Sequence, residues 1–121
     1  QEKGYSSHDA YSLSKLCNIV FTFALARRLG RPKPTVNTLD PGTVNTKMLK
    51  AGWGSWGIDV ATANNTLKVA TDPGLSQVTG KYYVGGSEAR APSPASDTGV
   101  QERLWKLWEQ QTGADWSSLK G

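Results

Sequence analysis

Residues 10–42 read AYSLSKLCNIVFTFALARRLGRPKPTVNTLDPG and join a long helical pattern to a short strand pattern. Residues 10–29 contain neither Gly nor Pro, and their apolar side chains recur every three or four positions in two neighbouring stripes. Ser7 or Asp9 is expected to cap the start of this helix, and Gly30 is expected to end it. Two stripes predict burial against two neighbours, such as a sheet and a second helix. The stripes consist of Leu13, Leu16, Cys17, Val20 and Ala24, and of Ile19, Phe23 and Ala26.

Downstream of this helix, short β-favouring runs alternate with helical patterns and with Gly- and Pro-rich breaks. Because helices separate the strands, the alternation indicates an α/β fold with parallel strands. Two strands cannot form a stable parallel sheet covered on both faces, so the pattern predicts the C-terminal half of a doubly wound domain with an incomplete sheet. On this interpretation, residues 1–121 belong to a single domain whose N-terminal half is absent from the chain. The expected elements are a helix over 10–29, a strand over 35–39, a loop over 43–57, a helix over 58–70, a strand over 81–84, a loop over 91–96 and a helix over 97–111.

Composition narrows the classes of protein to which the chain can belong. The single cysteine, Cys17, excludes an intrachain disulfide framework and a cysteine-based zinc site, and it fits a reducing intracellular compartment. With His8 as the one histidine, neither a metal site nor a Ser–His–Asp triad is expected. The net charge of +4 is dispersed, which argues against nucleic-acid binding. The longest apolar run, Ile19–Ala26, is far shorter than the roughly 20 residues that cross a bilayer, so no transmembrane segment is expected.

Tyr11 and Lys15 stand four positions apart near the start of the first helix, which places both side chains on one face. A phenol alone keeps its proton until about pH 10. An ammonium group beside it favours the phenolate, so such a pair can act as a general acid and base near neutral pH. Taken alone, the spacing favours an ordinary surface tyrosine beside a solvated lysine, because so short a motif often arises by chance.

Three motifs that follow one another along the chain favour a catalytic pair over a chance spacing. Residues 10–15, Ala-Tyr-Ser-Leu-Ser-Lys, resemble the Tyr-x-x-x-Lys motif of the short-chain dehydrogenase/reductase family. Residues 36–46, Val-Asn-Thr-Leu-Asp-Pro-Gly-Thr-Val-Asn-Thr, are similar to the family's strand and Pro-Gly-x-Val-x-Thr turn at the family's distance. Residues 78–83, Val-Thr-Gly-Lys-Tyr-Tyr, resemble its last strand in the branch close to retinol dehydrogenases, and the Trp-rich end resembles that branch as well. The resemblance covers nearly all 121 residues and implies a Rossmann-type fold.

The resemblance implies a role for each matching residue. Tyr11 would be the catalytic acid and base, giving a proton to a carbonyl oxygen or taking one from an alcohol. Lys15 would ease the loss of the Tyr11 proton and hold the nicotinamide ribose. The backbone N–H of Val44 and the hydroxyl of Thr46 would face the carboxamide or the pyrophosphate. The implied cofactor-binding residues are Tyr11, Lys15, Pro41, Gly42, Val44 and Thr46.

The implied enzyme is an oxidoreductase that transfers a hydride between NADP or NAD, with NADP favoured, and a small lipophilic alcohol or carbonyl compound. The chain departs from the family pattern in lacking the Gly-rich first turn and the catalytic serine and asparagine, all expected before residue 1. Asp40 stands where this branch often has His, Ser or Cys. These departures leave an alternative open, namely a truncated and catalytically inactive interaction module. Homo-oligomers are compatible with both.

The segment between the two predicted strands carries two tryptophans among glycines, Trp53 and Trp56. Such a segment suits a substrate lid, because its glycines permit movement and its indoles exclude water from a lipophilic substrate. An ordinary crossover loop that packs its indoles on the body of the protein explains the same residues equally well.

Overall fold

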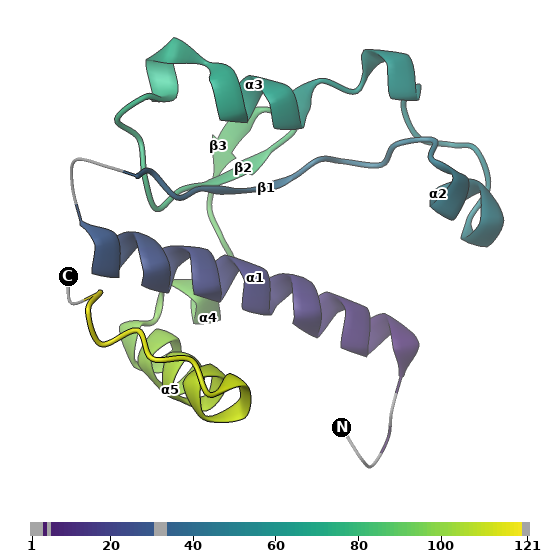
Figure 1. Ribbon diagram of the computed structural model, residues 1–121. Coiled ribbons are helices and arrows are strands. Elements are labelled where there is room, and N and C mark those ends of the chain that lie inside the picture. The colour runs from purple at the N-terminus through teal and green to yellow at the C-terminus, as the bar shows by residue number, and fades with distance from the viewer. Residues whose placement is uncertain (1–3, 5, 31–33, 120–121) are drawn as a thin grey trace.

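The computed structural model describes residues 4, 6–30 and 34–119, and Figure 1 shows their arrangement. One long helix lies between a small sheet and a pair of C-terminal helices. The elements are α1 (Ser7–Leu29), β1 (Thr38–Asp40), α2 (Lys47–Gly52), the 3-10 turn η1 (Val60–Thr62), α3 (Asn65–Thr71), the 3-10 turn η2 (Pro73–Leu75), β2 (Tyr82–Val84), β3 (Ser87–Ala89), α4 (Ser93–Ser96) and α5 (Thr98–Thr112).

The long helix α1 confirms the helical pattern, with a different cap at its start. Ser6 is the capping residue, since its Oγ accepts a hydrogen bond from the Asp9 N–H at 3.4 Å. The prediction of a cap at Ser7 or Asp9 is therefore wrong, because both residues already lie inside the helix. Gly30 ends the helix as expected, with a φ of 62° that side chains disfavour and an N–H that donates to the Ala26 carbonyl.

The sheet is mixed, in the order β1-β2-β3. β1 and β2 are parallel, with Thr38 opposite Tyr82, whereas β2 and β3 form an antiparallel hairpin. The expectation of an entirely parallel sheet is therefore wrong. Gly85 and Gly86 both adopt positive φ, the conformation that a two-residue hairpin turn requires. The chain therefore reverses direction after β2 and continues as β3.

The long helix α1 packs against β1 on one side and against α4 and α5 on the other, as the two apolar stripes predict. In Figure 1, α3 lies on the opposite side of the sheet from α1. The hydrophobic core centres on Ile19 and Val20 of α1 and on Ala91 and Ala95, and Leu16, Phe23, Tyr82, Leu104 and Trp108 pack around it. The molecule is thus α/β and compatible with part of a Rossmann-type domain, while its place as the C-terminal half of a doubly wound domain stays a prediction.

Three connecting segments differ from the sequence-based predictions. The expected loop over 43–57 contains α2, because Thr46 caps a helical turn by accepting the Leu49 N–H at 3.2 Å. The expected helix over 58–70 is divided into η1 and α3, since Ile58 forms a β-bridge instead of a helical turn. The expected loop over 91–96 contains the short helix α4. Within the described residues, none of the helices is both long and apolar enough to span a membrane.

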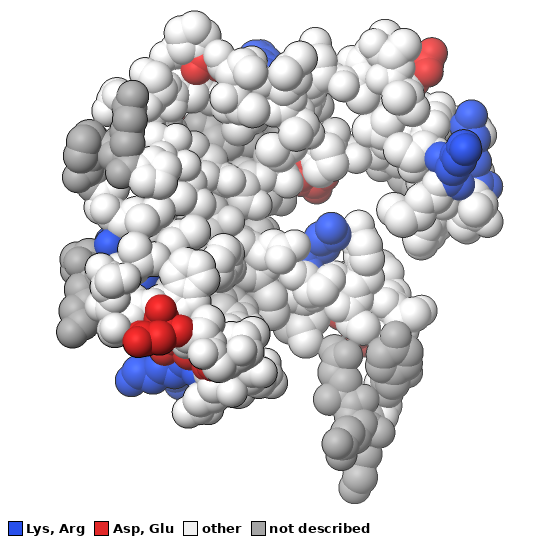
Figure 2. All heavy atoms as spheres, viewed as in Figure 1, with Lys and Arg blue, Asp and Glu red and all other residues white. Residues whose placement is uncertain are grey.

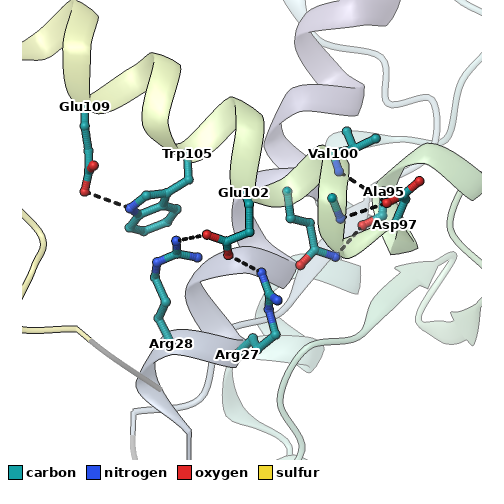
Figure 3. A network of polar contacts seen from close by, with 10 residues as sticks. Arg27, Arg28, Ala95, Asp97, Val100, Glu102, Trp105 and Glu109 are labelled. Atoms are coloured by element: carbon teal, nitrogen blue, oxygen red, sulfur yellow. Dashed lines mark hydrogen bonds and ion pairs between the residues drawn. The ribbon is translucent and has the colours of Figure 1, made fainter.

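A polar network joins the C-terminal end of α1 to α5 (Figure 3). Glu102 accepts hydrogen bonds from Arg27 and from Arg28, the latter at 2.7 Å, and the Arg28 guanidinium lies 4.2 Å from the centre of the Trp105 ring. Trp105 is only 4% exposed, whereas Leu107 on the same helix is 42% exposed. The indole N–H of Trp105 donates to the Glu109 carboxylate at 2.9 Å. These contacts lock the two helices together at one end.

Replacing Glu102 tests this junction. Hydrogen bonds from Arg28, followed by the charges of Arg28 and Arg27, hold the pKa of Glu102 below its ordinary value of 4.5. The stabilisation is therefore present above about pH 4.5 and is lost as the pH falls through the lowered pKa. Because the Glu102 side chain is 41% exposed, we expect Glu102→Gln to lower the unfolding free energy at pH 7 by only about 1 kcal/mol.

Urea denaturation at pH 7 and pH 3 measures this effect. The difference between Glu102→Gln and the unchanged protein should shrink as the pH is lowered from 7 to 3, because the carboxyl group of the unfolded chain takes up protons below about pH 4.5. Glu88→Gln removes the same charge from the exposed pair with Lys81 and should change stability little at either pH. An equal loss for both variants would contradict a special role for Glu102.

Candidate active site

Tyr11 and Lys15 lie side by side on α1. The Lys15 ammonium is 5.3 Å from the centre of the Tyr11 ring, which confirms that the two side chains share one face. Tyr11 is 56% exposed, and its backbone carbonyl accepts a hydrogen bond from the Ser14 hydroxyl at 2.7 Å. The C-terminal end of α1 is anchored to α5, so the pair is carried by a rigid element. The Tyr11 side chain faces solvent.

The segment that leaves β1 forms a tight turn followed by a capped helix. Asp40 accepts a hydrogen bond from the Gly42 N–H at 2.8 Å, and Gly42 adopts a φ of 76° that favours glycine. The Thr46 N–H donates to the Val44 carbonyl at 2.7 Å, and the Thr46 hydroxyl oxygen caps α2. In Figure 1 this segment runs back toward the N-terminal end of α1, on the side of the helix that faces the sheet.

A clamp that the sequence does not reveal closes the segment between residues 45 and 57. The Asn45 side chain donates to the Gly57 carbonyl at 2.7 Å and accepts the Gly57 N–H at 2.9 Å. A parallel bridge between Val44 and Ile58 lies next to this pair. Any side chain at Gly57 would come within 2.6 Å of the Thr43 carbonyl oxygen. Asn45 lies inside the recognised turn motif, but nothing local indicates a partner 12 residues away.

Residues 46–56 therefore form an arm that is closed at its base. Trp53 and Trp56 lie on this arm with 67% and 66% of their surface exposed, and Met48 is exposed as well. In Figure 2, basic side chains cover α2, and the molecule is hollowed between the arm and the N-terminal half of α1. The alternative in which both indoles pack on the body of the protein does not hold in this structure, because both stay largely in solvent.

A second polar contact ties α3 to the turn. The side-chain amide of Asn65, at the start of α3, donates to the Pro41 carbonyl at 3.4 Å. The same residue approaches the hairpin, since a Cβ atom at Gly86 would lie 3.2 Å from the Asn65 side-chain oxygen. Asn65 thus lies between the segment after β1 and the β2–β3 turn, and its hydrogen bond to Pro41 is not visible in the sequence.

The carboxylate of Asp40 is the principal charge beside the turn. Burial, and then the charge of Asp40, raises the pKa of the Tyr82 phenol on the neighbouring strand. Burial likewise raises the pKa of Tyr83, with a further contribution from Glu88. Both phenols therefore stay protonated near neutral pH. Tyr11 differs from them in position, since it lies on the exposed face of α1 next to an ammonium.

The structure brings some of the predicted site residues together and leaves others apart. Tyr11 and Lys15 form one pair, and residues 41–46 form one turn, but no hydrogen bond or ion pair joins the two groups within residues 4, 6–30 and 34–119. Trp53 and Trp56 share the arm.

The turn has the hydrogen-bonding capacity that a nicotinamide cofactor needs. Within the described residues the Val44 N–H has no acceptor, and the Thr46 hydroxyl still has its proton to donate after capping α2. Space is open around Gly42, because a Cβ atom there would meet nothing within 4 Å. These groups fit the carboxamide or phosphate oxygens of a dinucleotide, since both are hydrogen-bond acceptors.

Comparison with known proteins shows similarity along most of the chain. It is 32% identical to retinol dehydrogenase 14 of Homo sapiens over 126 residues, covering 93% of this chain and 38% of that relative. It is 30% identical to polyprenol dehydrogenase of Homo sapiens, covering 90% of this chain and 37% of that relative. It is 32% identical to short-chain dehydrogenase TIC 32 A, chloroplastic, of Brassica napus, covering 84% of this chain and 36% of that relative. The chain thus spans less than two fifths of the length of these curated relatives. No family model and no solved structure matches it.

The clamp can be tested with a pair of glycine replacements. Gly57→Ala would force its methyl group against the Thr43 backbone, so we expect a loss of about 1–3 kcal/mol in unfolding free energy. Gly52→Ala is the matched control at the end of α2, where a Cβ atom would meet nothing within 4 Å, and it should be neutral or slightly stabilising. Denaturant titration measures both. Equal stability of the two variants would show that the approach at Gly57 is not required.

Proposed function

Because the chain belongs to the short-chain dehydrogenase/reductase family, we propose that it forms part of an enzyme that transfers a hydride between NAD(P)(H) and an alcohol or carbonyl substrate. Its relatives named above are dehydrogenases, which supports an oxidoreductase in general terms. The observation that carries the finer proposal is the Tyr11–Lys15 pair, with the ammonium 5.3 Å from the phenol ring on the exposed face of α1.

In this proposal Tyr11 moves the proton. Its hydroxyl donates to the substrate oxygen during carbonyl reduction and takes the proton from the alcohol during oxidation. Lys15 favours the phenolate by its charge, and it can also donate hydrogen bonds to ribose hydroxyls. The nicotinamide, when bound, supplies or accepts the hydride. The chain's own contribution is therefore orientation and a path for the proton.

The turn after β1 would hold the cofactor. Within the described residues, its Val44 N–H and the proton of its Thr46 hydroxyl are available to donate hydrogen bonds. The open space at Gly42 allows a ligand to approach the backbone. Pro41 holds the start of the turn, and its carbonyl is fixed by Asn65. Whether the cofactor is NADP or NAD depends on contacts to the adenosine end, which these residues would not touch.

The exposed indoles support a lipophilic substrate. Trp53 and Trp56 extend from an arm whose base is closed by the Asn45–Gly57 clamp, and both side chains are largely exposed. Large exposed apolar side chains that gather on one segment commonly mark a contact surface. We propose that the arm closes over the substrate and excludes water from the reacting atoms.

Replacing Tyr11 tests the acid–base role. In the full-length protein, Tyr11→Phe removes only the hydroxyl, so turnover should fall by at least about 100-fold while cofactor binding stays nearly unchanged. Tyr83→Phe removes the same atom from β2 and is the matched control, with activity expected near that of the unchanged protein. Steady-state kinetics and calorimetric cofactor titration give the two readouts. Turnover by Tyr11→Phe at more than a few per cent of the control would exclude the assignment.

Replacing both indoles tests the substrate class. With Trp53→Ala and Trp56→Ala combined, the KM for long apolar alcohols should rise about tenfold, whereas the KM for short alcohols should change little. The indoles are exposed in the free protein, so the double variant should remain as stable as the unchanged protein. Kinetics over a series of alcohols of increasing chain length measure the effect. A KM change that is the same at every chain length would contradict a lid over a lipophilic substrate.

A further inference from the structure

Two Asp-Pro-Gly sequences occur in the chain, and they begin at Asp40 and at Asp72. In each of them the aspartate Oδ1 accepts the N–H of the glycine two residues later at 2.8 Å. Asp40 ends β1, next to the turn that would hold the cofactor, whereas Asp72 follows the last residue of α3. Because Asn65, at the start of α3, donates to the Pro41 carbonyl, the length of α3 separates the two aspartates.

The Asp40 carboxylate is directed toward the turn that follows it. Its Oδ1 is held by the Gly42 N–H, while within the described residues its other oxygen accepts no hydrogen bond and the carboxylate forms no ion pair. Asp40 is exposed and is the one acidic residue of the segment 34–58, whose lysines, Lys47 and Lys50, lie beyond the turn on α2. A negative charge is therefore fixed at the start of the turn.

This charge acts on groups to which it is not hydrogen-bonded. Burial and, after it, the negative charge of Asp40 raise the pKa of the Tyr82 phenol on the strand beside β1. The Val44 N–H and the open space at Gly42 belong to the turn that begins at Asp40. Since the Debye length is about 8 Å at physiological ionic strength, a cofactor in contact with this turn would lie within range of the carboxylate.

The two forms of a nicotinamide cofactor differ in the charge of the ring. The oxidised ring carries one positive charge, and the hydride that it accepts removes this charge. A fixed carboxylate beside the ring attracts the oxidised form and gives the reduced form no such attraction.

We propose that Asp40 is a specificity-determining residue, which makes the turn after β1 bind the oxidised dinucleotide more tightly than it would with an uncharged residue at this position. This inference rests on the proposed function. It names the alcohol as the matching substrate, because an oxidised cofactor accepts a hydride and an alcohol supplies one.

The test measures the dissociation constants of NADP⁺ and NADPH, and of NAD⁺ and NADH, by calorimetric titration of the full-length protein. Asp40→Asn removes the charge and keeps an oxygen for the Gly42 N–H. Because Asp40 is exposed, we expect the ratio of the dissociation constants, oxidised over reduced, to rise by about three- to tenfold in this variant. The shift should shrink at high salt, which screens exposed charges.

Asp72→Asn is the matched control. It removes one charge from the other Asp-Pro-Gly sequence and keeps the acceptor for the Gly74 N–H, so its ratio should equal that of the unchanged protein. Lys15 is present in every variant, so its charge cancels from the comparison. If Asp40→Asn does not fold, Asp40→Ser is the second neutral variant, because a serine hydroxyl can also accept the Gly42 N–H, and it should shift the ratio in the same direction.

The outcomes separate this inference from the proposed function. A ratio that rises in the Asp40 variants but not in Asp72→Asn supports the inference. Binding of both cofactor forms with an unchanged ratio in the Asp40 variants, or an equal shift in Asp72→Asn, would overturn it and leave the proposed function in place. If the unchanged protein binds none of the four dinucleotides, the proposed function fails and this inference fails with it.

Discussion

The burial of α1 between two different partners supports every other part of the structure. Val20 and Ala24 are almost fully enclosed, with β1 against one side of the helix and α4 and α5 against the other. At the C-terminal end, Glu102 ties Arg27 and Arg28 to α5. The helix is therefore fixed over its C-terminal half, whereas Tyr11 and Lys15 lie on its more exposed N-terminal half. A pair held on such a rigid element keeps its geometry better than one held on a loop.

The turn after β1 and the arm beyond it are separated by the Asn45–Gly57 clamp. The Asn45 side-chain amide donates one hydrogen bond to Gly57 and accepts another from it, next to the backbone bridge between Val44 and Ile58. The clamp closes the base of the arm, so the exposed indoles and the turn that the proposed cofactor would contact lie on opposite sides of it.

The polar and aromatic contacts of α5 have a different character from the core beneath α1. The core consists of aliphatic and small side chains such as Ile19 and Ala95, which need only volume and burial. The contacts between α1 and α5 instead combine ion pairs with indoles, and they leave a cavity lined mostly by aromatic side chains. Trp105 and Trp108 both pack against Phe21 of α1.

The sequence by itself determined α1, its end at Gly30, the pairing of Tyr11 with Lys15, and the turn at residues 41–46, because helical periodicity and turn chemistry act between residues a few positions apart. It also determined the strand at residues 82–84, but not the hairpin that follows, although Gly85 and Gly86 are its local signal. Only the tertiary structure decided that Asn45 holds Gly57 and that Glu102 bridges to α1. Those partners are 12 and about 75 residues apart in the chain, and contacts at such separations depend on how the packed elements meet rather than on local preference.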